Sequence, residues 1–529
     1  MNNEEKRNKK RYLISEICHK KYDCKFRELY RSYFLDYYPD RSERWEIKYK
    51  LKPFGKIERN NLSQALRTYS DYYKDVKYFK NLKKFIPKAE KCIGKDGIIK
   101  IKDINIDRDA IFYYYLQHWS GLRHFVIYNY HQRFDDSIQK AMEGFGNILM
   151  ERTIELNKRE VMMLLFWDNI QKQTDKTMAQ LLSKVEEYGW KTDEVKKKVK
   201  IYFLDVGDGK NDDDMQFLLR RLAMEIGDEK KKSGNIYYGS DFDQSISFAG
   251  MIMNPSNFKY FNEICLSRFL GFENLSGKLL FLGTRNYLVD RIEPLDLERF
   301  LYFSSIIFYF YGLRNPSDID LTCYSEPKPR KNLDNFFMKY ETGGEKMLGI
   351  GDLSIRGYGQ WTKTGEKQHL ENWFLKEWPA LFGADGYDDM IFNPRFHINI
   401  LGMKVITIEA DLARRKERHR PASYADLIAY NFLMPIPIHI EEPPEKYMVS
   451  QKEESYNTPD KIRDLIRKIR NYLRSRYDIN MDVMNIIEEL NISPKRLEIS
   501  EPVIRGVMRE ISLEKARRRI RAIEKIIRN

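Results

Sequence analysis

Residues 311–321, Tyr-Gly-Leu-Arg-Asn-Pro-Ser-Asp-Ile-Asp-Leu, decide the fold because they join a glycine turn to two carboxylates that are two residues apart. Side chains alternate along a β-strand, so Asp318 and Asp320 are predicted to project from one face of a strand, away from the core. Two neighbouring carboxylates repel each other, and a hard divalent cation with oxygen ligands offsets that repulsion. The stretch therefore predicts a magnesium site next to a phosphate-binding turn.

The segment before the turn, residues 300–310, is rich in aromatic and β-branched residues. We expect the end of this segment to be a buried strand that runs into the turn. Gly312 would let the backbone approach a ligand that any Cβ would obstruct. Arg314 and Asn315 follow at positions from which they would meet a phosphate.

This pattern resembles the nucleotidyltransferase superfamily, whose motif is a strand, a glycine turn and an Asp-x-Asp pair on the next strand. The resemblance implies a mixed α/β sheet, and carboxylates that hold two metal ions against a nucleoside triphosphate. Most active members carry Gly-Ser or Gly-Gly in the turn and a longer spacer than this chain has. Here Leu313 follows Gly312, and five residues separate Gly312 from Asp318, so a catalytically inactive member is the alternative.

Residues 396–431 look like the later half of the same fold. Members often show a strand, a Gly-x-Lys turn, a second apolar strand, a basic helix, and an Asp-Leu pair that starts or caps the last helix. The candidates here are Gly402, Lys404, Arg415, Arg418, Arg420, Asp426 and Leu427. An ordinary β-turn-β-helix unit with a solvated basic helix is the alternative.

A third carboxylate completes the metal site in this superfamily, and the sequence offers several. Asp352 lies in a strand-like stretch 32 residues past Asp320, which suits a neighbouring strand, and it is the favoured residue. The alternatives are Asp388, Asp389, Glu409 and Asp411, of which the last two are expected to cap the helix that follows.

The composition favours a nucleic-acid partner. The 529 residues include 92 Lys and Arg against 78 Asp and Glu, which gives a formal net charge of +14, and 14% of the residues are aromatic. Cations bind phosphates and ring faces stack on bases, as single-stranded nucleic acid requires. Most of these rings are nevertheless expected to fill the core, so the aromatic fraction does not by itself indicate nucleic-acid binding.

Cysteine content and hydropathy limit the class of protein further. None of the five cysteines forms a Cys-x-x-Cys pair, so neither a disulfide framework nor a structural zinc site is predicted. No apolar run reaches the roughly 18 residues of a membrane span, and the N-terminus lacks the apolar core of a signal peptide. We therefore expect a soluble, cytoplasmic protein with no membrane partner.

Changes of pattern divide the chain into four regions. Residues 1–200 are predicted to be mainly helical and basic. Residues 201–260 are predicted to form a small α/β unit, which one interpretation makes a degenerate nucleotidyltransferase-like repeat. The nucleotidyltransferase-like domain is predicted over residues 261–440, and a basic helical domain over residues 441–529. The fold class is therefore α/β (α+β), with a mixed sheet between helical termini.

The C-terminal region contains the clearest helical pattern. One apolar stripe is formed by Ile462, Leu465, Ile466, Ile469 and Leu473. Lysine and arginine cover the rest of the predicted helix, which indicates a bundle with a cationic outside. A surface that tracks nucleic-acid phosphates and a merely solvated face are the two interpretations.

Among nucleotidyltransferases, the chain most resembles the poly(A) polymerase catalytic subunit of giant (nucleocytoplasmic large DNA) viruses. The resemblance implies transfer of AMP from ATP to an RNA 3′ end, in a viral factory or virion. The metal ligands for Mg²⁺ or Mn²⁺ would be Asp318, Asp320 and Asp352, and the nucleotide contacts Gly312, Arg314, Asn315 and Lys404. Alternatives are an inactive fold that binds nucleic acid or serves in the virion, and a small-molecule or sugar nucleotidyltransferase. A homodimer is left open.

Overall fold

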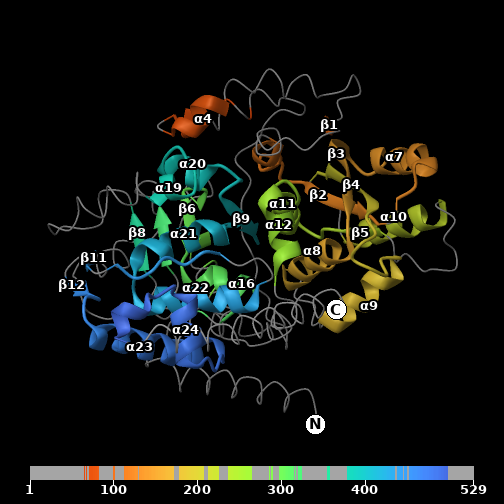
Figure 1. Ribbon diagram of the computed structural model, residues 1–529. Coiled ribbons are helices and arrows are strands. Elements are labelled where there is room, and N and C mark those ends of the chain that lie inside the picture. Colours follow the sequence, from red (N-terminus) through yellow and green to blue (C-terminus); the bar gives the residue numbers. More distant parts are fainter. Residues whose placement is uncertain are drawn as a thin grey trace, which may run out of the picture.

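The structure is a computed structural model of the 529-residue chain. It describes residues 65, 67, 71–74, 76–82, 99–101, 112–128, 130–171, 178–207, 212–225, 236–264, 281, 285, 288–289, 297–314, 316, 320–323, 354–357, 378–434, 438–444, 446–449 and 452–498. These residues form a mixed α/β architecture with two five-stranded sheets and one two-stranded sheet. Figure 1 shows the two large sheets side by side, with helices α11 (Phe242–Ile252) and α12 (Pro255–Glu263) between them.

The first sheet has the strand order β1-β3-β4-β2-β5. Its strands are β1 (Ile99–Ile101), β2 (Leu122–Ile127), β3 (Asn147–Leu156), β4 (Lys197–Asp205) and β5 (Ile236–Tyr238). Strands β1 and β3 are parallel, and the other neighbours are antiparallel. All of β4 from Val199 onward is buried, as a central strand covered on both faces requires.

Helices cover both faces of the first sheet, because side chains alternate along its strands. In β4, Val199, Ile201 and Phe203 face one cluster of buried side chains, while Tyr202 and Leu204 face the other. The first face is covered by α8 (Lys158–Gln171), α9 (Met178–Glu187) and α11 (Phe242–Ile252), and the second by α7 (Asp135–Glu143) and α10 (Asp212–Glu225). A 3₁₀ turn, η2 (Gln132–Phe134), precedes α7.

The second sheet has the strand order β8-β7-β6-β10-β9. Its strands are β6 (Phe300–Phe303), β7 (Asp320–Cys323), β8 (Ser354–Gly357), β9 (His397–Ile400) and β10 (Met403–Ile406). Strands β6 and β7 are antiparallel, and so are β9 and β10, whereas β6 is parallel to β10 and β7 to β8. The sheet is therefore mixed.

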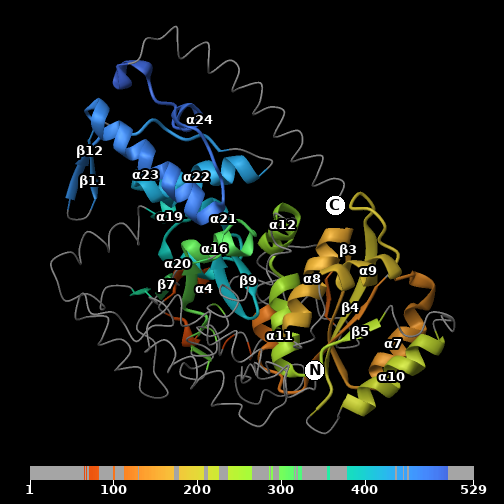
Figure 2. The ribbon, with the colours of Figure 1, turned by 90° about the horizontal axis from the view of Figure 1, so that it is seen from below.

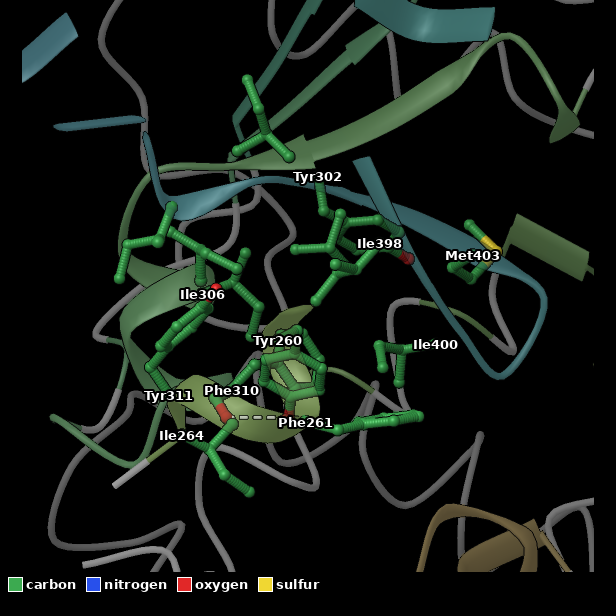
Figure 3. Close-up of a cluster of buried hydrophobic side chains, with 14 of the residues drawn as sticks. Tyr260, Phe261, Ile264, Tyr302, Ile306, Phe310, Tyr311, Ile398, Ile400 and Met403 are labelled. Atoms are coloured by element: carbon green, nitrogen blue, oxygen red, sulfur yellow. Dashed lines mark hydrogen bonds between the residues drawn. The ribbon is translucent and has the colours of Figure 1, made fainter. Parts of the chain in front are cut away.

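One face of the second sheet packs on α12 (Pro255–Glu263) and α16 (Ser305–Phe310). Figure 3 shows Tyr260 of α12 and Phe310 of α16 against Tyr302 and Ile398 of the sheet, and the Tyr260 hydroxyl donates to the Phe310 carbonyl at 2.8 Å. The opposite face lies against α19 (Trp378–Leu381), α20 (Tyr387–Phe392) and α4 (Lys77–Leu82), whose Phe79 contacts Phe392.

Strand β9, at the edge of the second sheet, is hydrogen-bonded by the side-chain amides of Asn254 and Asn257. The Asn257 amide accepts from the Asn399 N–H and donates to the Asn399 carbonyl, both at 2.7 Å. Asn254 donates to the His397 carbonyl at 2.7 Å. The amides therefore make hydrogen bonds that a further strand would otherwise make, and these backbone groups of β9 are not left open to pairing with another strand.

The C-terminal part consists of α21 (Ile408–Arg418), α22 (Pro421–Leu433), the hairpin β11 (Lys446–Val449) and β12 (Lys452–Ser455), α23 (Pro459–Tyr477), α24 (Val483–Glu489) and the 3₁₀ turn η5 (Pro494–Leu497). Figure 2 shows α23 lying along α22. The apolar stripe expected on α23 is confirmed, since Ile462, Leu465, Ile466, Ile469 and Leu473 are all buried. The strand-turn-strand-helix pattern expected over residues 396–431 is also confirmed by β9, β10, α21 and α22.

Three expectations about secondary structure need correction. Helices predominate in the described part of residues 1–200, as expected, but β1, β2, β3 and the start of β4 also lie there and build most of the first sheet, which was not expected. Residues 201–260 are no separate unit, because β5 pairs with β2. The end of residues 300–310, expected to be a strand, is helix α16, and the strand β6 lies at the beginning of this segment.

Each error has a physical cause. Short strands such as β1 and β5 carry too few residues to show a period, and long-range pairing completes them. In residues 300–310 a continuous apolar run fits a buried strand and a buried helix equally well.

Among the described helices, none combines the length and apolar composition that a membrane span needs.

The edge amide predicts a large loss of stability on truncation. Asn257→Ala leaves the buried N–H and carbonyl of Asn399 without their partner, so we expect the free energy of unfolding to fall by about 2–4 kcal/mol in urea denaturation. Asn471→Ala, on the exposed side of α23, is the control and should change the free energy by less than about 0.5 kcal/mol. Equal losses in both variants would contradict the role assigned to Asn257.

Candidate functional site

The turn that follows the central strand β6 is formed by Ser304 and Ser305, not by Gly312. Ser304 has φ 68° and ψ −132°, a conformation that glycine adopts easily and that a residue with a Cβ rarely does. Helix α16 begins directly after it, at Ser305. The sequence strand-turn-helix-strand therefore runs from β6 through Ser304 and α16 to β7, which begins at Asp320.

Gly312, the residue predicted to form the phosphate-binding turn, lies at the end of α16. Its φ is 68°, its N–H donates to the Tyr309 carbonyl, and the Leu313 N–H donates to the Phe308 carbonyl, each at 2.9 Å. These bonds are typical of a helix that ends in a left-handed residue. The conformational freedom of Gly312 is thus used to terminate the helix.

Asp320 begins β7 and is half-buried. It lies opposite Phe303 of β6 and beside Ser354 of the parallel strand β8. Its neighbour Leu321 pairs with Tyr302, which points to the α12 and α16 side in Figure 3. Asp320 therefore projects from the opposite face, the one covered by α19, α20 and α4.

Three predicted site residues, Asp318, Asn315 and Asp352, lie outside the described residues. In sequence, Asp352 comes two residues before Ser354, the residue of β8 that pairs with Asp320. Within the described part of the chain, no group of three or more His, Cys, Asp or Glu side chains is arranged to hold a metal ion. Of the predicted metal ligands, the structure thus places Asp320.

Asp411 connects helix α21 to the Ser304 turn. Its Oδ1 accepts a hydrogen bond from the Ser304 N–H at 3.1 Å, and also from Nε and Nη2 of Arg414 at 2.9 and 2.5 Å. Its Oδ2 accepts from Nε of Arg415 at 2.7 Å. Burial alone would raise the pKa of Asp411, but the two guanidinium groups hold it well below its ordinary value. Asp411 is therefore an ionised, fully buried carboxylate.

Arg414 lies between this carboxylate and the face of the sheet that carries Asp320. Its guanidinium carbon is 5.1 Å from the centroid of the Phe303 ring and 5.7 Å from that of Trp378. Burial lowers the pKa of Arg414, while Asp411 and, more weakly, Asp320 raise it. Arg414 therefore feels the charge of Asp320 as well as that of Asp411.

Asp426, inside α22, forms the second half of the same ionic cluster. It accepts from Arg415 and from the Tyr477 hydroxyl of α23, and Nε of Arg314 lies 3.3 Å from its Oδ1. We call the residues Asp411, Asp426, Arg314, Arg414, Arg415 and Tyr477 the buried ionic cluster. Burial alone would lower the pKa of Arg314, but Asp426 raises it above its ordinary value. Burial alone would also lower the pKa of Arg415, but Asp411 and Asp426 together raise it above its ordinary value.

The two cations predicted to bind phosphates are both buried in ion pairs. Arg314 belongs to the buried ionic cluster, and only 4% of its side chain is exposed. Nζ of Lys404 donates to the Glu298 carbonyl at 2.7 Å and forms an ion pair with Oε2 of the Glu298 carboxylate, also at 2.7 Å. It lies 4.8 Å from the centroid of the Phe392 ring. Burial lowers the pKa of Lys404, although Glu298 opposes the shift.

Lys404 and Asp320 share one face of the sheet, because Val405 pairs with Tyr302 and Lys404 points the other way. Two strand spacings and two residues separate them, which corresponds to about 12 Å. The structure therefore brings Lys404 to the correct face but not into contact with Asp320.

The alternative third carboxylates all have other partners. Asp388 accepts from the Tyr78 N–H, Asp389 from the Asp385 N–H and the Asn393 amide, and Glu409 from Lys259. Asp411 belongs to the buried ionic cluster. Asp352, the favoured third carboxylate, lies outside the described residues, so the structure assigns it no hydrogen-bond partner.

The basic residues of the later half are placed unequally. Arg415 is buried, Arg418 is half-buried near the end of α21, and exposed Arg420 precedes α22. Asp426 and Leu427 do not start or cap a helix as expected, because they lie buried in the middle of α22. Gly402, with φ 76°, forms the turn between β9 and β10.

Sequence reasoning missed Ser304, Ser305 and the role of Asp411. A signal for the turn was present, because two serines directly follow the aromatic run Phe300–Phe303 and residues 306–317 then lie before Asp318. This spacer is closer to that of the superfamily motif than the one counted from Gly312. Nothing in the sequence indicated the bond between Asp411 and Ser304, because 107 positions separate the two residues.

Comparison of the chain with protein-family models, with curated proteins and with solved structures gave no match. The interpretation of the site therefore depends on its geometry and on the motif resemblance.

The conformation of Ser304 predicts that glycine is the better residue there. Ser304→Gly removes a backbone strain of about 1–3 kcal/mol and adds about 1 kcal/mol of unfolded-state entropy, so we expect a net gain of about 1 kcal/mol in unfolding free energy, measured in urea. Ser475→Gly, on the exposed side of α23, should instead lose about 0.5 kcal/mol through helix propensity. A loss of stability at both positions would show that Ser304 is not strained.

Proposed function

We propose that this protein is a nucleotidyltransferase that transfers AMP from ATP to the 3′ end of an RNA. The observation that supports the proposal most is the path from β6 through the Ser304 turn and α16 to Asp320, the first residue of β7. The mixed sheet places a parallel strand, β8, next to β7. A strand, a turn with a glycine-type backbone and a carboxylate on the next strand is the motif that the resemblance implies.

Accessibility supports the placement of the reaction at this turn. Ser304 and Asp320 are half-buried, whereas Phe303, Ser305 and Leu321 beside them are buried. A polar, partly open point thus lies at one end of the β6-β7 pair. We place the triphosphate there. The Ser304 N–H is bonded to Asp411, so the other N–H groups of the turn would face the phosphates.

Carboxylate oxygens are the ligands that Mg²⁺ and Mn²⁺ prefer, and Asp320 with Asp318 and Asp352 would supply them. When bound, these ions neutralise the triphosphate and lower the pKa of the RNA 3′-hydroxyl. The 3′ oxygen attacks the α-phosphorus, the bond from that phosphorus to the bridging oxygen breaks, and pyrophosphate leaves. The hydroxyl proton passes to solvent. Asp320 must remain half-open for this role, as it is in the structure.

Helix α23 would position the RNA. Its apolar stripe is buried, and Arg463, Arg467, Arg470 and Arg474 lie exposed at helical spacing along another side. Arg463 pairs with Asp460 and Arg467 with Asp464, but Arg470 and Arg474 make no ion pair with the residues that the structure describes. Surface pairs of this kind are weak and yield to a phosphate.

A second function, RNA binding without catalysis, is favoured by one observation. Arg314 and Lys404, the two cations expected at the phosphates, are held in buried ion pairs. A triphosphate would then depend on the metal ions and the turn alone. The two functions differ in their products, and one assay separates them.

The assay measures incorporation of labelled ATP, and separately of the other nucleotides, onto a short RNA with Mg²⁺ or Mn²⁺. We expect the double variant Asp318→Ala, Asp320→Ala to lose more than about 1,000-fold of the wild-type rate, because both ions lose ligands. The matched control, Asp136→Ala with Glu155→Ala, removes two exposed carboxylates of the first sheet unit and should leave the rate unchanged. RNA binding without tailing in the wild type would establish the second function instead.

The α23 surface predicts a change in salt dependence. Three phosphate contacts are removed in the variant Arg467→Gln, Arg470→Gln, Arg474→Gln, so the slope of log K against log salt for a single-stranded RNA should shrink by about 2. Fluorescence anisotropy at several salt concentrations measures it.

The control for this experiment neutralises equal charge elsewhere. Lys191→Gln, Lys196→Gln and Lys198→Gln remove three exposed lysines beside or in β4. Their slope should match the wild type. Equal slopes for the two triple variants would show that α23 contributes only general charge.

A further inference from the structure

We propose that Asp411 is a positioning residue that holds the turn of residues 303–305 in its glycine-type conformation and so sets the active-site geometry around Asp320. This inference rests on the proposed function, since it names the residue through which helix α21 acts on that site. Asp411 touches neither substrate nor metal in this proposal. It acts through the Ser304 backbone and through Arg414.

The first step concerns the turn itself. A serine with positive φ persists only where the surrounding structure holds it, because other backbone conformations are more favourable for a residue with a Cβ. The N–H of Ser304 donates to Asp411, across 107 positions of sequence. A hydrogen bond to an ionised carboxylate is about twice as strong as one between neutral groups. The bond therefore opposes relaxation of the turn.

The second step concerns the direction of the bonds around Asp411. Arg414 and Arg415 lie three and four positions further along the same helix, so their pairing with Asp411 belongs to α21 alone. Within the described part of the chain, the Asp411 carboxylate makes one hydrogen bond to a residue outside α21. Its donor is the N–H of Ser304, directly after strand β6. A carboxylate needed only to neutralise the two arginines would not have to reach the turn.

The third step connects the same carboxylate to Asp320. Arg414 donates to Asp411 and lies over the Phe303 ring, and Phe303 faces Asp320 across the β6-β7 pair. The turn and the carboxylate on β7 are thus fixed relative to each other by one ion pair. A shift of the turn by an ångström would misplace the phosphates against the metal ligands, which costs about 100-fold in rate in enzymes generally.

The experiment is a double-mutant cycle of Asp411→Asn and Ser304→Gly in the full chain. We expect Asp411→Asn to lower kcat of RNA tailing about 100-fold, with KM for ATP changed less than about 3-fold. A glycine does not need to be held in this conformation, so adding Ser304→Gly should restore kcat about 10-fold. Ser304→Gly alone completes the cycle and supplies the reference rate against which the effect of Asp411→Asn in the glycine background is measured.

Two further variants separate positioning from folding. Asp411→Glu keeps the charge opposite the arginines but moves the carboxylate by one methylene, so it covers the case in which Asp411→Asn fails to fold. It should lose kcat and be rescued by Ser304→Gly in the same way. Tyr477→Phe removes a donor to Asp426 at the far end of the buried ionic cluster and should change kcat less than about 3-fold.

A second readout does not need activity. Hydrogen exchange of the peptide 300–310, followed by mass spectrometry, should show about 5-fold to 10-fold faster exchange at the turn in Asp411→Asn than in the wild type or in Tyr477→Phe. If the wild type transfers no nucleotide, the proposed function fails, and this exchange alone decides whether Asp411 holds the turn.

The inference is overturned by any of three results. The first is a kcat of Asp411→Asn within about 3-fold of the wild type. The second is a loss of kcat that Ser304→Gly does not rescue, because Asp411 then has a merely structural role. The third is exchange at residues 300–310 that is unchanged in Asp411→Asn.

Discussion

The buried ionic cluster is the interaction on which the second half of the structure depends. Asp411 and Asp426 are fully buried, and charges of this kind are stable only when hydrogen bonds and opposite charges satisfy them. Removing one partner of such a pair typically costs about 3–5 kcal/mol, which is a large part of the stability of a domain. The cluster therefore fixes the elements that carry it.

Those elements are distant in sequence. Arg314 follows α16, Asp411 and the two remaining arginines belong to α21, Asp426 to α22, and Tyr477 ends α23. Helix α23 packs along α22, and the bond from Tyr477 to Asp426 joins the two helices. A surface proposed to hold RNA is in this way tied to the turn proposed to hold the triphosphate.

Patterns with a regular period were predictable from the sequence, and features made by long-range contacts were not. The stripe of α23 follows from hydrophobic periodicity, and the β9-β10-α21-α22 order was expected from the motif resemblance; the structure confirms both patterns. The burial of Arg314 and Lys404 could not be predicted from periodicity, because a basic residue is expected to be exposed unless its buried partner is known. The positive φ of Ser304 could not be predicted either, because serine, unlike glycine, does not indicate that conformation.

The charge count of the cluster leads to a last step. Three guanidinium groups, those of Arg314, Arg414 and Arg415, face two carboxylates, those of Asp411 and Asp426. One positive charge is left over, and Arg414 feels the charge of Asp320.

Arg414 lies over Phe303, which pairs with Asp320, so its positive charge lies on the face of the sheet that carries Asp320. Asp318 lies two positions before Asp320 in sequence, and a positive charge on this face would offset part of the repulsion expected between their carboxylates. The same arginine that stabilises the turn through Asp411 would then also make it easier for the fold to keep two acidic residues at neighbouring positions. That would explain why an arginine with two aromatic rings against its guanidinium, Phe303 and Trp378, lies buried behind the proposed metal site.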